Sequence, residues 1–258
     1  MPILFPGRLP PGALVHGHVT APVIIPPTGR PAPIWLTVDP ACCEFSEANP
    51  GRITGWQARG DQNTTALAVA ANESGTHFVP SPPHLQFETG VNGGMFLPDT
   101  IPDADCVTVG MICRLAPGED ARTLLSLQSR GDDNYLFLSG DDGNLRLTQK
   151  TGNEELVLPL PEPAAKAVLL LFAVASGRMF MAVNAAQPVS ATTVNNPVGR
   201  ADLFVGCRNA RSGLQNKLGR FTLTDVMIWP DKNLFDSPDN PALAAAEALW
   251  KARSVDEL

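Results

Sequence analysis

The sequence predicts an all-β protein that folds as a two-layer sandwich, and three observations lead to this prediction. Short segments alternate apolar and polar side chains with a period of two residues, the spacing of a half-buried strand. The chain contains 22 Gly and 25 Pro, so turn residues separate these segments at short intervals. Only the end of the chain shows helical spacing. Many short strands joined by Gly and Pro turns are typical of a β-sandwich or jelly roll.

A chain of 258 residues with 44% hydrophobic residues is long enough to bury one sizeable core. It shows no internal repeat and no second globular domain. We therefore divide it into an N-terminal arm over residues 1–40, a sandwich over 41–235 and a helical tail over 236–258.

The first 40 residues are expected to form an extended arm. They hold ten of the 25 Pro and one acidic residue, Asp39, and each Pro fixes its backbone and removes a hydrogen-bond donor. Two apolar pieces, Ala13–Val15 and Val23–Ile25, favour docking onto a surface. The sequence leaves open whether that surface is the arm's own domain or a neighbouring subunit, and a free tail is a further alternative.

Two hairpins are predicted in the middle of the chain. Segments 135–138 and 144–150 flank a Gly-Asp-Asp-Gly turn, and segments 166–174 and 178–183 flank a Ser-Gly turn. Because 166–174 is apolar on both faces, it should be a central strand covered on both sides. A helix over 164–175 is also compatible with its composition.

Two further strands are expected at Asp202–Gly206 and Leu218–Trp229, and the period then changes. Asn240 can cap a helix and Pro241 suits the first helical turn. Apolar residues recur at helical spacing over 242–252, which predicts a helix with one stripe packed on the sandwich. The residues of this stripe are Leu243, Ala246, Leu249 and Trp250.

Composition excludes several classes of protein. The formal net charge of −7 argues against binding to duplex nucleic acid. The longest apolar run, Ala167–Ala175, is far shorter than the ~20 residues of a membrane-spanning helix. The first residues do not resemble a secretory signal, so we expect synthesis in the cytoplasm and reduced thiols for the five Cys.

Four segments together resemble the concanavalin A-like lectin superfamily, in its laminin G-like and pentraxin-like branch. They are Ile53–Asp61, Leu85–Phe96, Ala167–Ala186 and Gly219–Trp229. The resemblance spans about residues 50–235 and implies a jelly roll that binds carbohydrate or protein. The chain departs from the family pattern at Asn184-Ala185, where relatives carry Asn-Gly. Domains of this kind without a secretory signal also occur as fibres or spikes of phage and gene-transfer-agent particles.

The sequence offers little for catalysis or for a metal. Glycan hydrolases of this fold carry carboxylates on alternate residues of one strand, and no such run is present. A lyase that uses His77 or His84 with Tyr135 is conceivable. Segments 132–134 and 141–144 offer oxygen ligands for calcium, but Asp, Asn and Gly are also ordinary turn residues. We therefore expect neither an enzyme nor a cofactor.

The candidate binding site is the loop after the strand at 202–206. Residues 200–220 carry five basic residues against one acid, Asp202, which gives a local charge of +4. Guanidinium and amide groups suit the hydroxyl and carboxylate groups of sugars. The predicted carbohydrate-binding residues are Arg208, Asn209, Arg211, Gln215 and Asn216. A solvated loop or a subunit contact is the alternative.

Sugar rings also stack on exposed aromatic side chains, and this chain has few. The amphipathic candidates are Trp35, Trp56, Trp229, Trp250 and Tyr135. The family resemblance places Trp56 and Trp229 near the packed core rather than on the surface.

The sequence thus predicts a non-enzymatic binding protein. It would be a homo-oligomer, held by its N-terminal arm to other subunits of a released phage-like particle, and would bind cell-surface polysaccharide without nucleic-acid binding or membrane insertion. The alternatives are a structural subunit without a ligand and an enzyme that cleaves polysaccharide.

Overall fold

The computed structural model describes residues 32–72, 75–115, 121–131, 134–141, 143–150, 155–161, 166–184, 186–193, 196–211 and 217–255. Most of the predicted arm, with both of its apolar pieces, lies outside these residues.

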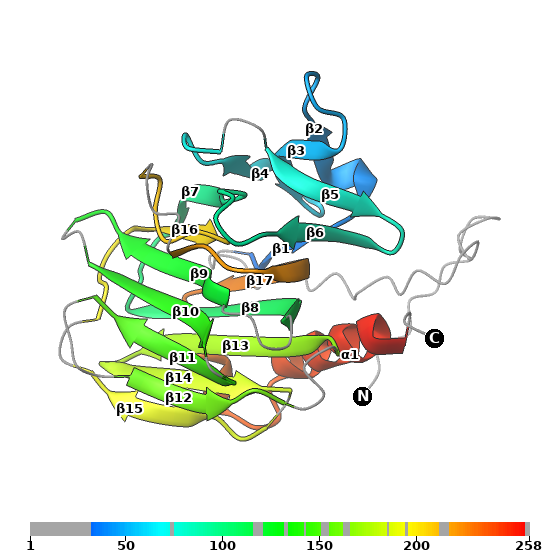
Figure 1. Ribbon diagram of the computed structural model, residues 1–258. Helices are drawn as coiled ribbons and strands as arrows, with labels where there is room; N and C mark the ends of the chain where they lie inside the picture. Colours follow the sequence, from blue (N-terminus) through cyan, green and yellow to red (C-terminus); the bar gives the residue numbers. More distant parts are fainter. Residues whose placement is uncertain are drawn as a thin grey trace, which may run out of the picture.

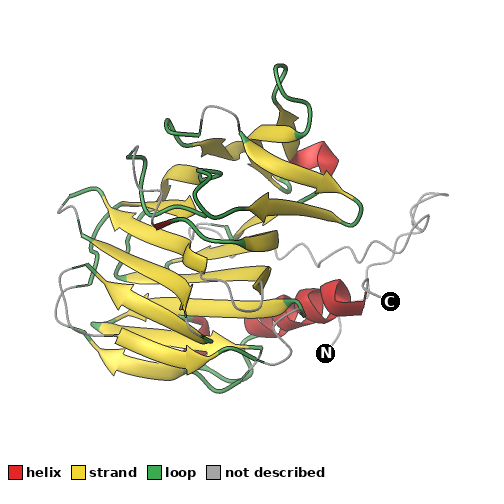
Figure 2. Cartoon of the chain, in the orientation of Figure 1, coloured by secondary structure: helices red, strands yellow, loops and turns green. Residues whose placement is uncertain are grey.

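Two layers of antiparallel strands form the molecule (Figures 1 and 2). The first layer contains, in spatial order, β12 (Glu155–Pro159), β11 (Asn144–Gln149), β10 (Tyr135–Asp141), β9 (Ala121–Ser129), β16 (Ala201–Val205), β7 (Met95–Ile101) and β4 (Asp61–Ala68). The second contains β15 (Val189–Thr192), β14 (Arg178–Val183), β13 (Val168–Ala175), β8 (Cys106–Leu115) and β17 (Phe221–Pro230).

The two layers are joined at one side by the N-terminal strands. β6 (Pro83–Phe87) and β1 (Ile34–Thr37) pair with successive parts of β17. β3 (Arg52–Ala58) pairs with β4 of the first layer, and also with β1, β2 (Cys43–Phe45) and β5 (Thr76–Pro80). Of the short 3-10 helices in the described residues, η1 (Pro40–Cys42) lies between β1 and β2, and η3 (Leu234–Asp236) follows β17.

Both predicted hairpins are present. β10 pairs with β11 as far as Asp141 and Asn144, and β13 pairs with β14 as far as Ala175 and Arg178. The second turn has positive φ at two successive residues, 50° at Ser176 and 71° at Gly177. This conformation matches the right-handed twist of a hairpin. The helix that 164–175 could have formed by composition is therefore replaced by a strand.

β13 is buried along its whole length, as the sequence predicted. Alternate residues, Leu170 and Phe172 among them, face the core between the two layers. Leu169 and Leu171 face a second cluster beneath helix α1 (Pro241–Val255). Figure 1 shows α1, in red, lying against the end of β13. The helix therefore covers the outer face of the second layer. In the part of the chain that the structure describes, no helix combines the length and the apolar character needed to cross a bilayer.

The sandwich begins inside the segment that the sequence assigned to the arm. Ile34–Thr37 forms β1 and pairs with β17 from Ile228 to Asp225. The indole of Trp56, fully buried, donates to the carbonyl of Thr37 at 2.8 Å. This part of the predicted arm is therefore packed within the fold, because its side chains complete the core beside β3 and β17.

A bulge in β17 turns one carboxylate toward the helix. The pairing of β17 with β8 shifts between Leu223 and Asp225. Asp225 therefore lies on the helix side, fully buried, although two residues earlier Leu223 faces the core. There Arg253 Nε donates to Asp225 Oδ2 at 2.9 Å, and Trp35 Nε1 donates to Oδ1 at 3.0 Å. Arg253 also donates to the hydroxyl of Thr37 at 2.9 Å.

Candidate functional site

The outward face of the first layer carries polar and aromatic side chains. Along β10 the side chains of Leu136 and Leu138 are buried in the core. Tyr135 and Phe137 alternate with them and are half-buried on the opposite face. Because neighbouring side chains of a strand point to opposite faces, β10 supplies two aromatic rings to this surface.

Strand register arranges these side chains in rows. Gln128 on β9 lies opposite Tyr135 on β10 and opposite Asp202 on β16. Neighbouring strands are about 4.8 Å apart, so the row from Asp202 to Tyr135 spans about 10 Å. The ammonium of Lys150 lies 5.5 Å from the centre of the Tyr135 ring. The row therefore presents one aromatic ring between hydrogen-bonding and charged groups.

The loop after β16, residues 206–211, folds back over this face. The guanidinium carbon of Arg208 lies 3.6 Å from the centre of the Phe137 ring, well inside cation–π range. One of its N–H groups donates to the carbonyl of Arg122 at 3.4 Å. Burial lowers the pKa of Arg208 from its usual value, while contact with Tyr135 opposes this shift. Arg208 therefore holds the loop against β10.

A groove of ≈ 550 Å³ opens between this loop and the strands beside it. Its walls combine one aromatic ring with amide, hydroxyl, carboxylate and guanidinium groups. The end of β9 contributes Gln128 and Ser129, and Arg130 follows directly after it. β16 contributes Asp202 and Phe204, and the loop contributes Asn209, Ala210 and Arg211. Such a lining suits a polar ligand that also has an apolar surface.

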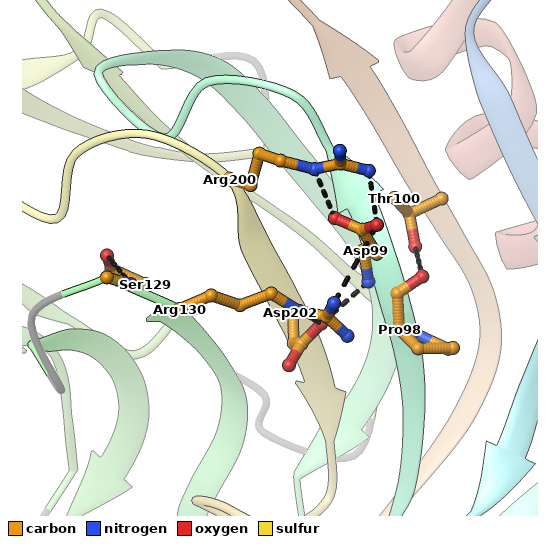
Figure 3. A network of polar contacts seen from close by, with 8 residues as sticks. Pro98, Asp99, Thr100, Ser129, Arg130, Arg200 and Asp202 are labelled. Atoms are coloured by element: carbon orange, nitrogen blue, oxygen red, sulfur yellow. Dashed lines mark hydrogen bonds and ion pairs between the residues drawn. The ribbon is translucent and has the colours of Figure 1, made fainter.

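Two arginines neutralise the two aspartates beside the groove (Figure 3). Arg200 binds Asp99 through two N–H groups, with Nε donating to Oδ1 at 2.6 Å and Nη2 to Oδ2. Arg130 Nε donates to Asp202 Oδ1 at 2.8 Å, and Arg130 Nη1 lies 3.7 Å from Asp99 Oδ2. The backbone N–H of Asp99 donates to the same Asp202 oxygen at 2.6 Å. Both carboxylates are thus engaged within the protein.

The predicted binding residues take different positions. Asn209 and Arg211 line the groove, and the Asn209 side chain accepts from the Arg211 backbone N–H at 2.9 Å. Arg208 packs behind the groove on Phe137 instead of lining it. Gln215 and Asn216 lie outside the described residues.

The sequence analysis missed the residues that the strands contribute to the groove. Gln128 belongs to a strand that the sequence did not single out, Arg130 follows directly after that strand, and Phe204 was assigned only to a strand. One signal was present, because Tyr135 and Phe137 are aromatic residues at alternate positions of a predicted strand. The pairing of β9 with β16 had no local signal, since 72 residues separate Arg130 from its partner Asp202.

The candidate lyase residues are not brought together, and three of the candidate calcium residues lie outside the described residues. Within the described residues there is no cluster of three His, Cys, Asp or Glu side chains that could hold a metal. Asp132, Asp133 and Asp142 are not among them. His77 on β5 and His84 on β6 lie in the upper part of Figure 1, away from β10 and its Tyr135.

The solved structures that resemble this chain include a sialidase, the binding domain of a mosquitocidal protein and a pair of laminin domains. A sialidase of Trypanosoma rangeli in complex with 2,3-difluorosialic acid has a TM-score of 0.55 and 16% identity, over 90% of this chain and 34% of its own. The binding domain of a paraclostridial mosquitocidal protein has a TM-score of 0.53 and 12% identity, and the match covers 84% of this chain and 51% of that protein's chain. Domains LG4-5 of the mouse laminin α1 chain have a TM-score of 0.44 and 17% identity, and the match covers 62% of this chain and 44% of the laminin chain.

The likenesses to the sialidase and to the mosquitocidal protein show the fold alone, because both sequence identities are below 20%. The chain spans about a third of the sialidase chain. The predicted all-β jelly-roll sandwich with a short C-terminal helix is confirmed. No family model and no curated protein matches the chain.

The prediction that this chain is not an enzyme is contradicted by the same comparison. Its fold occurs within sialidases, which are enzymes. The missing carboxylate run argued against one kind of glycan hydrolase only, so the prediction of no activity reached further than its evidence. A shared fold assigns no reaction, and we assign none.

Proposed function

We propose that this chain binds a carbohydrate in the groove between β9, β16 and loop 206–211. The observation that carries this proposal is the groove itself, where guanidinium and amide groups stand beside the ring of Phe204, and where Gln128 lies opposite Tyr135 of β10. Sugars offer many hydroxyl groups for paired hydrogen bonds and an apolar C–H face for an aromatic ring. The fold supports the proposal, since a sialidase that shares it was solved with 2,3-difluorosialic acid.

The first test is glycan binding by two variants that leave the core intact. Tyr135→Ala removes a half-buried ring, and Gln128→Ala removes an amide from the groove. We expect each to weaken binding about tenfold on a glycan array and in titrations, because each removes roughly 1.4 kcal/mol of contact. Phe45→Ala is the matched control, since Phe45 is a 39% exposed aromatic residue on β2, away from the groove. Absence of binding by the wild-type protein to every glycan would contradict the proposal and favour a structural subunit without a ligand.

We also propose that the ligand is a cell-surface polysaccharide and that the chain is a subunit of a phage-like spike or fibre. The support is the resemblance of the chain to such appendages and the Pro-rich arm, which would attach each copy. Repeated copies raise overall affinity by ~10²–10⁴ over a single site. A weak groove would therefore suffice on a particle that carries many copies.

Removal of residues 1–31 tests the role of the arm. We expect the shortened chain to keep its unfolding midpoint and its affinity for a single glycan, but to lose oligomer mass in light scattering and to bind a glycan-coated surface more weakly. An unchanged oligomer mass would contradict the attachment role. A lower unfolding midpoint would instead assign the arm to its own domain.

A further inference from the structure

We infer that the groove selects an acidic saccharide, one that carries a carboxylate or sulfate group, and that Arg211 is the residue that recognises this group. The inference rests on the proposed carbohydrate site and specifies its class of ligand. It follows from the balance of charges at the groove and from the partners that each charge already has.

The charges beside the groove do not cancel. Arg130 and Arg200 are paired with Asp99 and Asp202, so these four side chains are neutral together. Arg208 and Arg211 remain, and neither has a carboxylate partner among the described residues. Segment 212–216, which follows Arg211, contains no acidic residue in its sequence. Among the described residues, the site thus carries positive charge in a chain whose net charge is −7.

Asp132 and Asp133, which lie between β9 and β10 in the sequence, are outside the described residues. Within the described residues, no carboxylate compensates the positive charge of Arg208. Its guanidinium is stacked on Phe137, and its Nε is buried without a hydrogen-bond partner in the described structure. A fixed cation in a partly desolvated position attracts anions more strongly than one in water.

Arg211 is placed to make the direct contact. The Asn209 side chain accepts from its backbone N–H, which fixes the loop at this point. Its own side chain is exposed at the wall of the groove. A guanidinium offers two parallel N–H groups, which match the two oxygens of a carboxylate or sulfate. In the same groove, the Asp202 carboxylate is paired with Arg130, which reduces its repulsion of such a ligand.

The test compares acidic probes with matched neutral ones. The pairs are oligogalacturonate and its methyl ester, hyaluronan oligosaccharides before and after carboxyl reduction, and dextran sulfate and dextran, beside an array of neutral and acidic glycans. We expect the acidic member of at least one pair to bind about tenfold more tightly. We expect this preference to fall between about 0.05 and about 0.5 M NaCl, since added salt screens an exposed ion pair. Comparison of the carboxylate pairs with the sulfate pair shows which anionic group the groove recognises.

Arg211→Gln should remove the preference, so that acidic and neutral members bind alike, while the unfolding midpoint stays unchanged. Arg59→Gln is the matched control, because it removes the same charge at an exposed residue that lies 5.0 Å over Trp35 on the helix side of the molecule. The preference of the Arg59→Gln variant for acidic over neutral glycans should equal that of the wild type. Equal binding of neutral and acidic glycans by the wild type, or an unchanged preference in Arg211→Gln, would overturn this inference and leave the carbohydrate site standing. Binding to no glycan at all would instead overturn the site.

Discussion

Replacement of Arg253 by alanine is expected to lower the free energy of unfolding by about 3 kcal/mol. The Asp225 side chain has no exposed surface, and Arg253 donates to both of its oxygens. Without Arg253, the neutral indole of Trp35 is the one side-chain donor that the described residues still offer to the buried carboxylate. Breaking a buried ion pair costs far more than breaking an exposed one, because a charge is left in a poorly solvated position. Chemical denaturation measures the change.

Lys251→Ala provides the matched control on the same helix. Lys251 is exposed and lies 3.9 Å from Glu247, so its loss should cost less than about 0.5 kcal/mol. In an Asp225→Asn background, Arg253→Ala should cost clearly less than in the wild type, which isolates the pairwise energy. Equal effects of Arg253→Ala and Lys251→Ala would show that the buried pair contributes nothing to stability.

Gly206→Ala is expected to destabilise the protein by about 3 kcal/mol, the sum of a backbone and a packing cost. Gly206 has a φ of 69°, which disfavours residues with a Cβ. A Cβ there would overlap the ring of Phe87, and that ring is stacked on Phe221 with centres 4.3 Å apart. Since Gly206 begins the loop that walls the groove, the same variant should also weaken glycan binding.

Gly199→Ala separates the two costs. Its φ is 68°, but a Cβ at this position would meet nothing within 4 Å. It should therefore show only the backbone cost, about 1 kcal/mol, in the same denaturation experiment. If the two glycine variants lose equal stability, the Phe87 ring moves aside without cost and the packing explanation is wrong.

The parts of the fold that the sequence predicted are those with a local pattern. The turn at Ser176-Gly177 lies between two apolar strands, and Asn240-Pro241 precedes an alanine-rich helix. In each case the residues that form the turn or the cap lie close in the sequence to the strands or the helix that they predict. The Asn240 side chain accepts from the backbone N–H of Ala242 at 3.0 Å, as expected for a cap.

The features that the sequence could not predict depend on pairing between distant segments. The bulge in β17 reverses the alternation that Phe221 and Leu223 begin, so Val226 faces the core and Asp225 does not. Nothing within the strand indicates this shift, since it is fixed by its register with β8.

The candidate site was likewise predictable only where it depends on a local sequence pattern. The basic loop was visible in the sequence, but its arginines take different roles that only the fold assigns. Arg200 binds Asp99, Arg208 stacks on Phe137, and Arg211 lines the groove. The position of Asp99 also needs an unusual backbone, with a φ of 56°, next to an irregular pairing of β7 with β16.

The cluster around Asp225 joins the two ends of the described chain. Arg253 reaches Thr37 across 216 positions of sequence, and both meet the carboxylate of β17. During synthesis, β17 therefore leaves the ribosome before the arginine that compensates its aspartate. The sandwich can therefore reach its final stability only after translation has passed helix α1.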